Sequence, residues 1–228
     1  AATGQTLWVH DPRMYEAGTP APTPWAHRGV SYWENGGDAR IVWGTGDGHL
    51  VAVDAMTGLP AADFGDNGKV DLADSLPRVV RGRRDNLNLL PLSSLSAPLV
   101  VGDTIIIGSS INDFSITKEM PPGFSRAYDA RTGAHKWDFH NVPQSGDEFG
   151  SDTWGDESWR YSGNANTWSN MSADPELGIV YLPTSTPTSD YYAGHRPGDN
   201  LFAESLVAVD LETGQRLWHF QMVHHGVW

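Results

Sequence analysis

The chain contains no cysteine in its 228 residues. Disulfide bonds and cysteine-ligated metal centres are therefore excluded. No stretch approaches the ~18 consecutive apolar residues of a membrane-spanning helix, so we expect membrane association only through parts outside this chain. Basic residues are few, 15 against 28 acidic ones, and the net charge of −13 argues against a nucleic-acid-binding surface. An ordinary solubility charge would explain the same acidic excess.

The two ends of the sequence carry no terminal signals. The chain opens at Ala1 without methionine or signal peptide and stops at Trp228, directly after an apolar strand pattern. We therefore expect an internal piece of a longer protein, spanning residues 1–228 as a single partial domain. Glycine (25), proline (15) and tryptophan (10) are abundant, and helical periodicity is weak. That mix is typical of an all-β protein rich in turns.

A repeated segment organises the chain. The pattern Asp-x-x-Thr-Gly, preceded by an apolar strand, occurs at residues 52–58, 127–133 and 208–214, and residues 1–4 end another copy. A tryptophan follows the glycine by four residues in three copies, at Trp8, Trp137 and Trp218, whereas Ala62 stands there after Gly58. In each copy we expect Asp and Thr to bond nearby backbone and Gly to adopt a positive φ.

Hairpin patterns fill the intervals between the repeats. Residues 41–53 and 99–107 each read as two apolar strands joined by a Gly-Asp turn, and residues 177–181 begin another strand. Four-stranded antiparallel sheets repeated radially make a β-propeller. We therefore predict about three blades plus a fragment, too few to close a ring. A β-sandwich is the structural alternative, although it does not explain an in-frame repeat.

The repeat with its tryptophan resembles the tryptophan-docking motif of the dehydrogenases that depend on pyrroloquinoline quinone (PQQ), which are eight-bladed propellers. Four segments between the repeats are similar to that family, closest to its membrane-bound glucose and polyol branch. The resemblance implies a partial eight-bladed propeller of four-stranded antiparallel sheets. It also implies PQQ and Ca²⁺ or Mg²⁺ as cofactors.

Three residues match the family's PQQ-binding positions. Arg28, in Arg-Gly-Val-Ser-Tyr, corresponds to an arginine near the quinone, and a guanidinium pairs well with carboxylates such as those of PQQ. Trp168, before an Asp-Pro turn, corresponds to the floor under the flat PQQ rings. Ser96 matches loosely a hydroxyl that bonds a PQQ carboxylate. A surface arginine and a blade-packing tryptophan are the alternative readings.

The resemblance also implies metal ligands. Asp113, with Asn112 beside it, matches the position of an oxygen ligand for the divalent cation, although Asn-Asp is also a common turn. Thr186 stands where the alcohol dehydrogenases of the family have a cation-binding asparagine. Thr188 matches a threonine of the glucose dehydrogenase branch. These departures favour a sugar or polyol enzyme over a methanol-type one.

The last segment, from Gln221 to Trp228, is similar to a His-rich strand end that in the family leads into Trp-Asp. That aspartate is the general base, so we expect the base just beyond Trp228 and assign no catalytic residue within the chain. His225, with His224 beside it, would line the cofactor pocket.

The resemblance implies a periplasmic oxidoreductase that oxidises a sugar or alcohol by hydride transfer to PQQ. The electrons would pass to ubiquinone or a cytochrome. We expect the 228-residue piece alone to be inactive. The alternative is a non-catalytic propeller of similar repeats that acts as a binding or assembly scaffold; a non-acidic residue after Trp228 would favour it.

Overall fold

The computed structural model describes residues 3–22, 25–79, 83–115 and 117–227. Strands and turns dominate it, and the helices in these ranges are short 3-10 turns. They are η1 (Met14–Ala17), η2 (Arg83–Asp85), η3 (Leu87–Leu89), η4 (Ser151–Thr153) and η5 (Gly155–Arg160). No helix in the described ranges is long and apolar enough to cross a bilayer.

The strands form three four-stranded sheets and one two-stranded sheet, and every pair of neighbouring strands is antiparallel. The first sheet has the order β1 (Ser31–Asn35), β2 (Asp38–Gly44), β3 (His49–Asp54), β4 (Lys69–Asp71). The second has the order β10 (His135–His140), β9 (Phe124–Asp129), β7 (Thr104–Gly108), β6 (Leu99–Val101). The third has the order β11 (Ser172–Asp174), β12 (Ile179–Pro183), β13 (Ser205–Asp210), β14 (Arg216–Gln221). The two-stranded sheet pairs β5 (Leu92–Ser93) with β8 (Ser110–Ile111). The all-β class and its four-stranded antiparallel sheets are thus confirmed.

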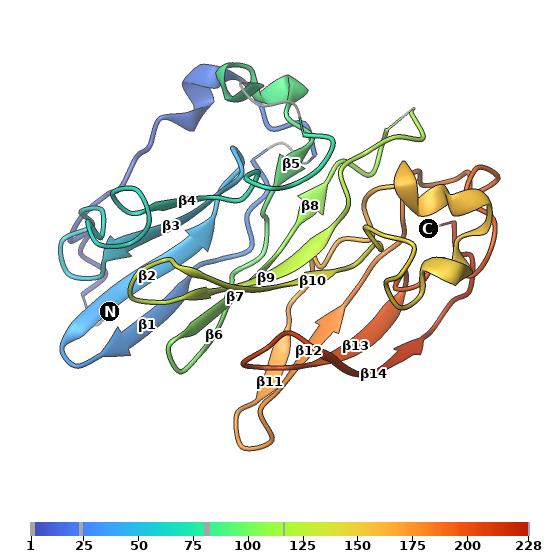
Figure 1. Ribbon diagram of the computed structural model, residues 1–228. Coiled ribbons are helices and arrows are strands. Elements are labelled where there is room, and N and C mark those ends of the chain that lie inside the picture. The colour runs from blue at the N-terminus through green and yellow to red at the C-terminus, as the bar shows by residue number, and fades with distance from the viewer. Residues whose placement is uncertain (1–2, 23–24, 80–82, 116, 228) are drawn as a thin grey trace.

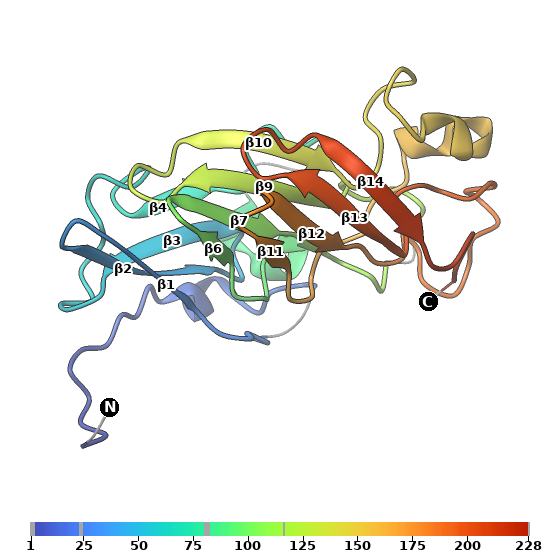
Figure 2. The same cartoon turned by 90° about the horizontal axis from the view of Figure 1, so that it is seen from below.

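The three large sheets lie next to one another in chain order, with the second sheet in the middle (Figures 1 and 2). Strand β7 of the middle sheet contributes side chains to the cores on both of its faces. Ile105 and Ile107 face a core shared with the first sheet, whereas Ile106 faces a core shared with the third. Because successive side chains of a strand point to opposite faces, only a strand covered on both sides buries such an unbroken apolar run.

The repeated turns have the predicted geometry. The Asp54 carboxylate accepts hydrogen bonds from the Met56 and Thr57 amides and from the Thr57 hydroxyl, at 2.7–3.0 Å. The same set recurs around Asp129 and Asp210. The glycines after them have φ of 71°, 70° and 69°, a conformation that a side chain disfavours.

Tryptophans of the repeat lie over the turns of following repeats. Trp8 Nε1 donates to the Ala55 carbonyl at 3.1 Å and Trp137 Nε1 to the Leu211 carbonyl at 2.9 Å. Each ring covers the turn glycine so closely that a Cβ there would lie 2.5–2.6 Å from ring carbons. Where Ala62 replaces the tryptophan, Phe64 is fully buried and its ring takes part in covering Gly133.

Candidate functional site

Trp168 emerges at the end of a buried segment that crosses from the second sheet to the third. Residues 162–167 are buried, and Trp168 is 36% exposed. The segment passes so close to Gly108, at the end of β7, that a Cβ on Gly108 would lie 1.8 Å from the Thr167 carbonyl oxygen. Only glycine fits there, and the close passage fixes the position at which the indole leaves the protein interior.

Arg28 and Ser96 both hold Trp168. The Arg28 guanidinium carbon lies 4.4 Å from the centre of the indole ring, and its Nη1 donates to the Trp168 carbonyl oxygen at 3.1 Å. The hydroxyl of Ser96, which is buried, donates to the same carbonyl oxygen. Two of the predicted PQQ-binding residues, Arg28 and Ser96, are therefore in direct contact with a third, Trp168.

Asp113 lies beside Trp168 and is held by two buried amides. Its Oδ1 accepts hydrogen bonds from Asn164 Nδ2 and, at 3.2 Å, from Asn166 Nδ2. Asn166 also bonds Ser109 and both backbone groups of Ile111. Burial raises the pKa of Asp113, and the two amide hydrogen bonds oppose that rise.

A cavity of about 180 Å³ lies against Trp168. Its lining is Asp113, Trp168, Ser185, Thr186, Asp190 and Glu204. A neighbouring cavity of about 160 Å³ shares Asp113 and Trp168 and adds Arg28. The structure therefore gathers four predicted residues, Arg28, Trp168, Asp113 and Thr186, around two adjoining cavities.

Excess negative charge marks the larger of these two cavities. Burial, together with repulsion from Asp113 and Glu204, raises the pKa of Asp190 to about 6. Behind the cavity, burial lowers the pKa of the fully enclosed Arg196 to about 10, while Glu204 and Asp190 oppose that fall. The six lining residues include three carboxylates and no basic side chain.

Three predicted residues lie elsewhere. Asn112 accepts a hydrogen bond from the Phe114 amide, as in a local turn, and lines a different cavity. Thr188 is fully buried behind the site, and its hydroxyl has no partner among the described residues. The His225 ring bonds the Gly198 carbonyl oxygen at 2.7 Å and lines neither cavity. Trp228, which would precede the expected base, lies outside the described residues.

Sequence reasoning missed Asn164, Asn166, Asp190, Glu204 and Arg196. Of these, only Asn166 had a visible signal, because it lies two residues before Trp168. The other four are distant in sequence from Asp113 and Trp168 or lie in segments without a recognisable pattern.

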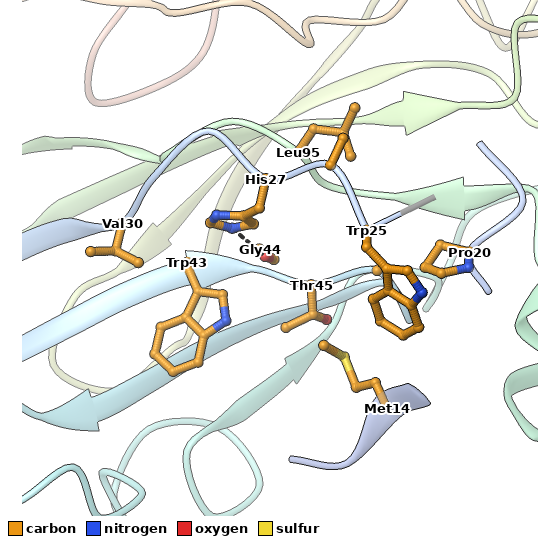
Figure 3. Close-up of a pocket in the computed structure, with 11 residues that line it drawn as sticks. Met14, Pro20, Trp25, His27, Val30, Trp43, Gly44, Thr45 and Leu95 are labelled. Carbon is orange, nitrogen blue, oxygen red and sulfur yellow. Dashed lines mark hydrogen bonds between the residues drawn. The ribbon is translucent and has the colours of Figure 1, made fainter. Parts of the chain in front are cut away.

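A separate apolar cavity of about 240 Å³ lies between the N-terminal segment and the first sheet (Figure 3). Met14, Trp25, Trp43 and Leu95 line it, and the ring of His27 reaches the Gly44 carbonyl oxygen at 3.1 Å. None of the predicted site residues lines this cavity. Its lining is mostly apolar, with His27 and Thr45 as its polar side chains, and therefore suits hydrophobic contact.

The donor set around Trp168 fits the two implied cofactors. A flat anionic ring system would find an exposed indole with a guanidinium already against it. A hard cation would find Asp113, Thr186 and Ser185 as oxygen donors. In the described part of the chain, no three His, Asp or Glu side chains converge closely enough to hold a metal by themselves. The ligand set would therefore have to include hydroxyl or main-chain oxygens.

Comparison with known proteins identifies the family of the chain. The family described as glucose/ethanol/alcohol dehydrogenase, beta-propeller domain, of the PQQ group, matches residues 1–228. The glycerol dehydrogenase large subunit of Gluconobacter oxydans is 34% identical over all of this chain and 30% of its own length. The quinoprotein glucose dehydrogenase of the same organism is 30% identical over all of this chain and 28% of its own length.

Solved structures of alcohol dehydrogenases share the fold of this chain. The quinohemoprotein alcohol dehydrogenase of Comamonas testosteroni superposes with a TM-score of 0.76 at 26% identity, over all of this chain and 32% of its own. The enzyme ADHIIG of Pseudomonas putida gives 0.74 at 30% identity, over 97% of this chain and 30% of its own. The chain thus spans about a third of these relatives. The chain belongs to the family of PQQ-dependent glucose, ethanol and alcohol dehydrogenases.

Proposed function

We propose that the protein containing this chain is a PQQ-dependent dehydrogenase that oxidises a sugar or alcohol at a CH–OH group. The observation that carries the proposal is the contact of Arg28 with Trp168 beside Asp113. A single wall thus offers a flat apolar surface, a fixed cation and a half-buried carboxylate. A quinone with several carboxylates and a bound divalent cation needs these three features together.

Each residue has a role in this proposal. Trp168 supports the cofactor ring, Arg28 pairs with its carboxylates, and Ser96 keeps Trp168 in place through the carbonyl oxygen. Asp113 and Thr186, with Ca²⁺ or Mg²⁺ between them, are the proposed oxygen ligands. When bound, PQQ supplies the ortho-quinone that accepts a hydride from the substrate carbon. Asn112, Thr188 and His225 would have to move to reach these groups, so we give them no direct role.

The whole protein would extend beyond these 228 residues. We propose an eight-bladed propeller in which residues 1–228 form one continuous part and tryptophans dock on neighbouring repeats throughout. The electrons would leave to ubiquinone or a cytochrome in the periplasm. We place the base beyond Trp228 and expect no turnover from these 228 residues alone. The geometry of the described residues favours the dehydrogenase over the scaffold alternative, because a scaffold needs neither Arg28 on Trp168 nor a half-buried Asp113.

Titration of the full-length protein with PQQ in the presence of Ca²⁺ tests the proposal. The wild type should bind PQQ and oxidise sugars or alcohols with an artificial electron acceptor. Trp168→Ala should lose most of the binding, because it removes the stacking surface. Trp25→Ala is the matched control, since Trp25 is also an exposed tryptophan ring, lies outside the repeat and lines neither of the two cavities beside Trp168. Absence of PQQ binding by the wild type would refute the dehydrogenase and favour the scaffold.

A further inference from the structure

Glu204 stands out among the residues that line the larger cavity. It precedes β13 with a φ of 47°, in the left-handed region that a glutamate rarely adopts. Its amide donates to the Ser185 carbonyl at 3.2 Å, and its carbonyl accepts from the Met222 amide at 2.9 Å. The surrounding chain therefore holds an unfavourable backbone conformation in place, which is a feature of functional sites.

The two oxygens of the Glu204 carboxylate differ in their surroundings. Oε1 accepts a hydrogen bond from the Thr186 hydroxyl at 3.1 Å. Oε2 is buried and makes no hydrogen bond within the described structure. It lies against Gly226, where an added Cβ would be 1.8 Å away. A buried carboxylate oxygen without a hydrogen-bond partner is unfavourable, so a positive partner would stabilise Oε2.

Arg196, the buried cation near Glu204, makes no hydrogen bond to Oε2 in the described structure. Arg196 is the buried cation whose charge acts on Glu204, but its Nη1 donates to Asn200 and its Nη2 to the Gly226 carbonyl, at 2.9 and 2.7 Å. Its Nε is buried and has no hydrogen-bond partner among the residues that the structure describes. The guanidinium therefore lies close enough for electrostatic attraction and makes no hydrogen bond to the carboxylate.

We propose that Glu204 is a direct ligand of the cation that this cavity holds, together with Asp113 and Thr186. The inference rests on the proposed function, because it places the cation in the cavity beside Trp168. With Glu204 as a ligand, the cation would have two carboxylate ligands, Asp113 and Glu204, and Asp190 would add a third negative charge to the lining. Ligand charge and rigidity are what set the affinity of such sites for Ca²⁺.

The test measures cation binding without turnover. The full-length protein is freed of metal and titrated with Ca²⁺ by calorimetry, and with Tb³⁺ by the luminescence that a nearby tryptophan, here Trp168, excites. Glu204→Gln keeps the shape of the side chain and removes its charge. We expect Glu204→Gln to weaken Ca²⁺ binding about tenfold or more and to lower the Tb³⁺ signal at a fixed concentration.

Matched variants separate the possible outcomes. Glu176→Gln makes the same chemical change on an exposed turn and should leave binding within about twofold of the wild type. Asp113→Asn should weaken binding strongly. If Asp113→Asn weakens binding while Glu204→Gln matches the wild type, the role of Glu204 is refuted and the cation site stands. If the wild type binds neither ion, the proposed cation site and the role of Glu204 both fall.

Folding of the variants is checked by circular dichroism and thermal melting. Should Glu204→Gln fail to fold, Glu204→Asp provides the second measurement. It keeps the charge but shortens the reach, so weaker binding by a folded Glu204→Asp supports direct ligation. Unchanged binding by that variant counts against it.

Discussion

The guanidinium of Arg28 packs on the indole of Trp168, 4.4 Å from its centre, and donates to the carbonyl oxygen of the same residue, 140 positions away in the chain. A ring contact and a hydrogen bond from one side chain fix both partners. The pair therefore joins the segment before the first sheet to the segment before the third, and cofactor binding is expected to depend on both residues.

Arg28→Lys should weaken PQQ binding about tenfold or more, because an ammonium neither packs flat on indole nor forms two parallel bonds to a carboxylate. Quenching of tryptophan fluorescence during PQQ titration gives the affinity. Arg13→Lys is the control, since Arg13 is exposed, pairs with Glu16 on the surface and lines neither cavity. Equal affinity of Arg28→Lys and the wild type would show that the Arg28 contact serves the fold alone.

Gly214→Ala should destabilise the protein more than Gly178→Ala. Both glycines have nearly the same positive φ, 69° and 68°, so the backbone strain of about 1 kcal/mol or somewhat more is shared. At Gly214 the new Cβ would also lie 2.6 Å from the Trp137 ring, whereas nothing lies within 4 Å at Gly178. Overpacking should add about 1–3 kcal/mol.

Urea unfolding of the full-length protein measures that difference in the free energy of unfolding. Equal losses in the two variants would mean that the Trp137 ring moves aside without cost. The ring would then contribute little to holding the second and third sheets together.

Gly226→Ala should reduce Ca²⁺ affinity in the same direction as Glu204→Gln, although it changes no charge. The added methyl would overlap Glu204 Oε2 and push the carboxylate out of position. Gly146→Ala is the matched control, because its nearest neighbour would be a Trp159 atom at an ordinary 3.9 Å and no positive φ is involved. Calorimetric titration compares the two. An unchanged affinity in Gly226→Ala would show that the position of Oε2 is irrelevant to the site.

The repeated turns should lose stability in acid. Hydrogen bonds from the Thr57 hydroxyl and backbone hold the pKa of Asp54 below its ordinary value of 3.8, and those from Thr213 do the same for Asp210. A carboxyl whose pKa is lower in the folded state stabilises the fold above the unfolded pKa. That contribution disappears as the pH falls through the folded-state pKa.

Asp210→Asn should therefore be less stable than the wild type near neutral pH, and the difference should shrink below pH of about 3.8. Asp66→Asn, on another exposed turn, controls for the loss of one charge. Urea unfolding at several pH values tests this expectation. A difference that stays constant with pH would mean that the ionised form of Asp210 gives no advantage.

More of the fold than of the candidate site could be predicted from the sequence. The turns around Asp54, Asp129 and Asp210 were predictable because the hydrogen bonds to their carboxylates span only two or three residues. Hairpins were predictable for the same reason. The loss of the tryptophan at Ala62 was visible, but the contribution of Phe64 at Gly133 depends on how two sheets meet.

Within the site, family resemblance identified Arg28, Trp168, Asp113 and Thr186, which the structure brings together. It also selected Asn112 and His225, whose side chains bond local or neighbouring backbone and line neither cavity. Position along a motif cannot show the direction of a side chain. That direction depends on the local backbone and on what packs against it.

The sequence by itself determined the β-strands, the Asp-x-x-Thr-Gly turns and the series of blade-like units, because these follow from interactions between residues close in the chain. Only the tertiary structure decided that Arg28 covers Trp168, that Asn164 and Asn166 hold Asp113, and that Glu204 meets Thr186. These contacts join residues from 18 to 140 positions apart. They exist because burial of apolar faces packs the sheets together, and the polar loops between the strands are carried into contact as a result.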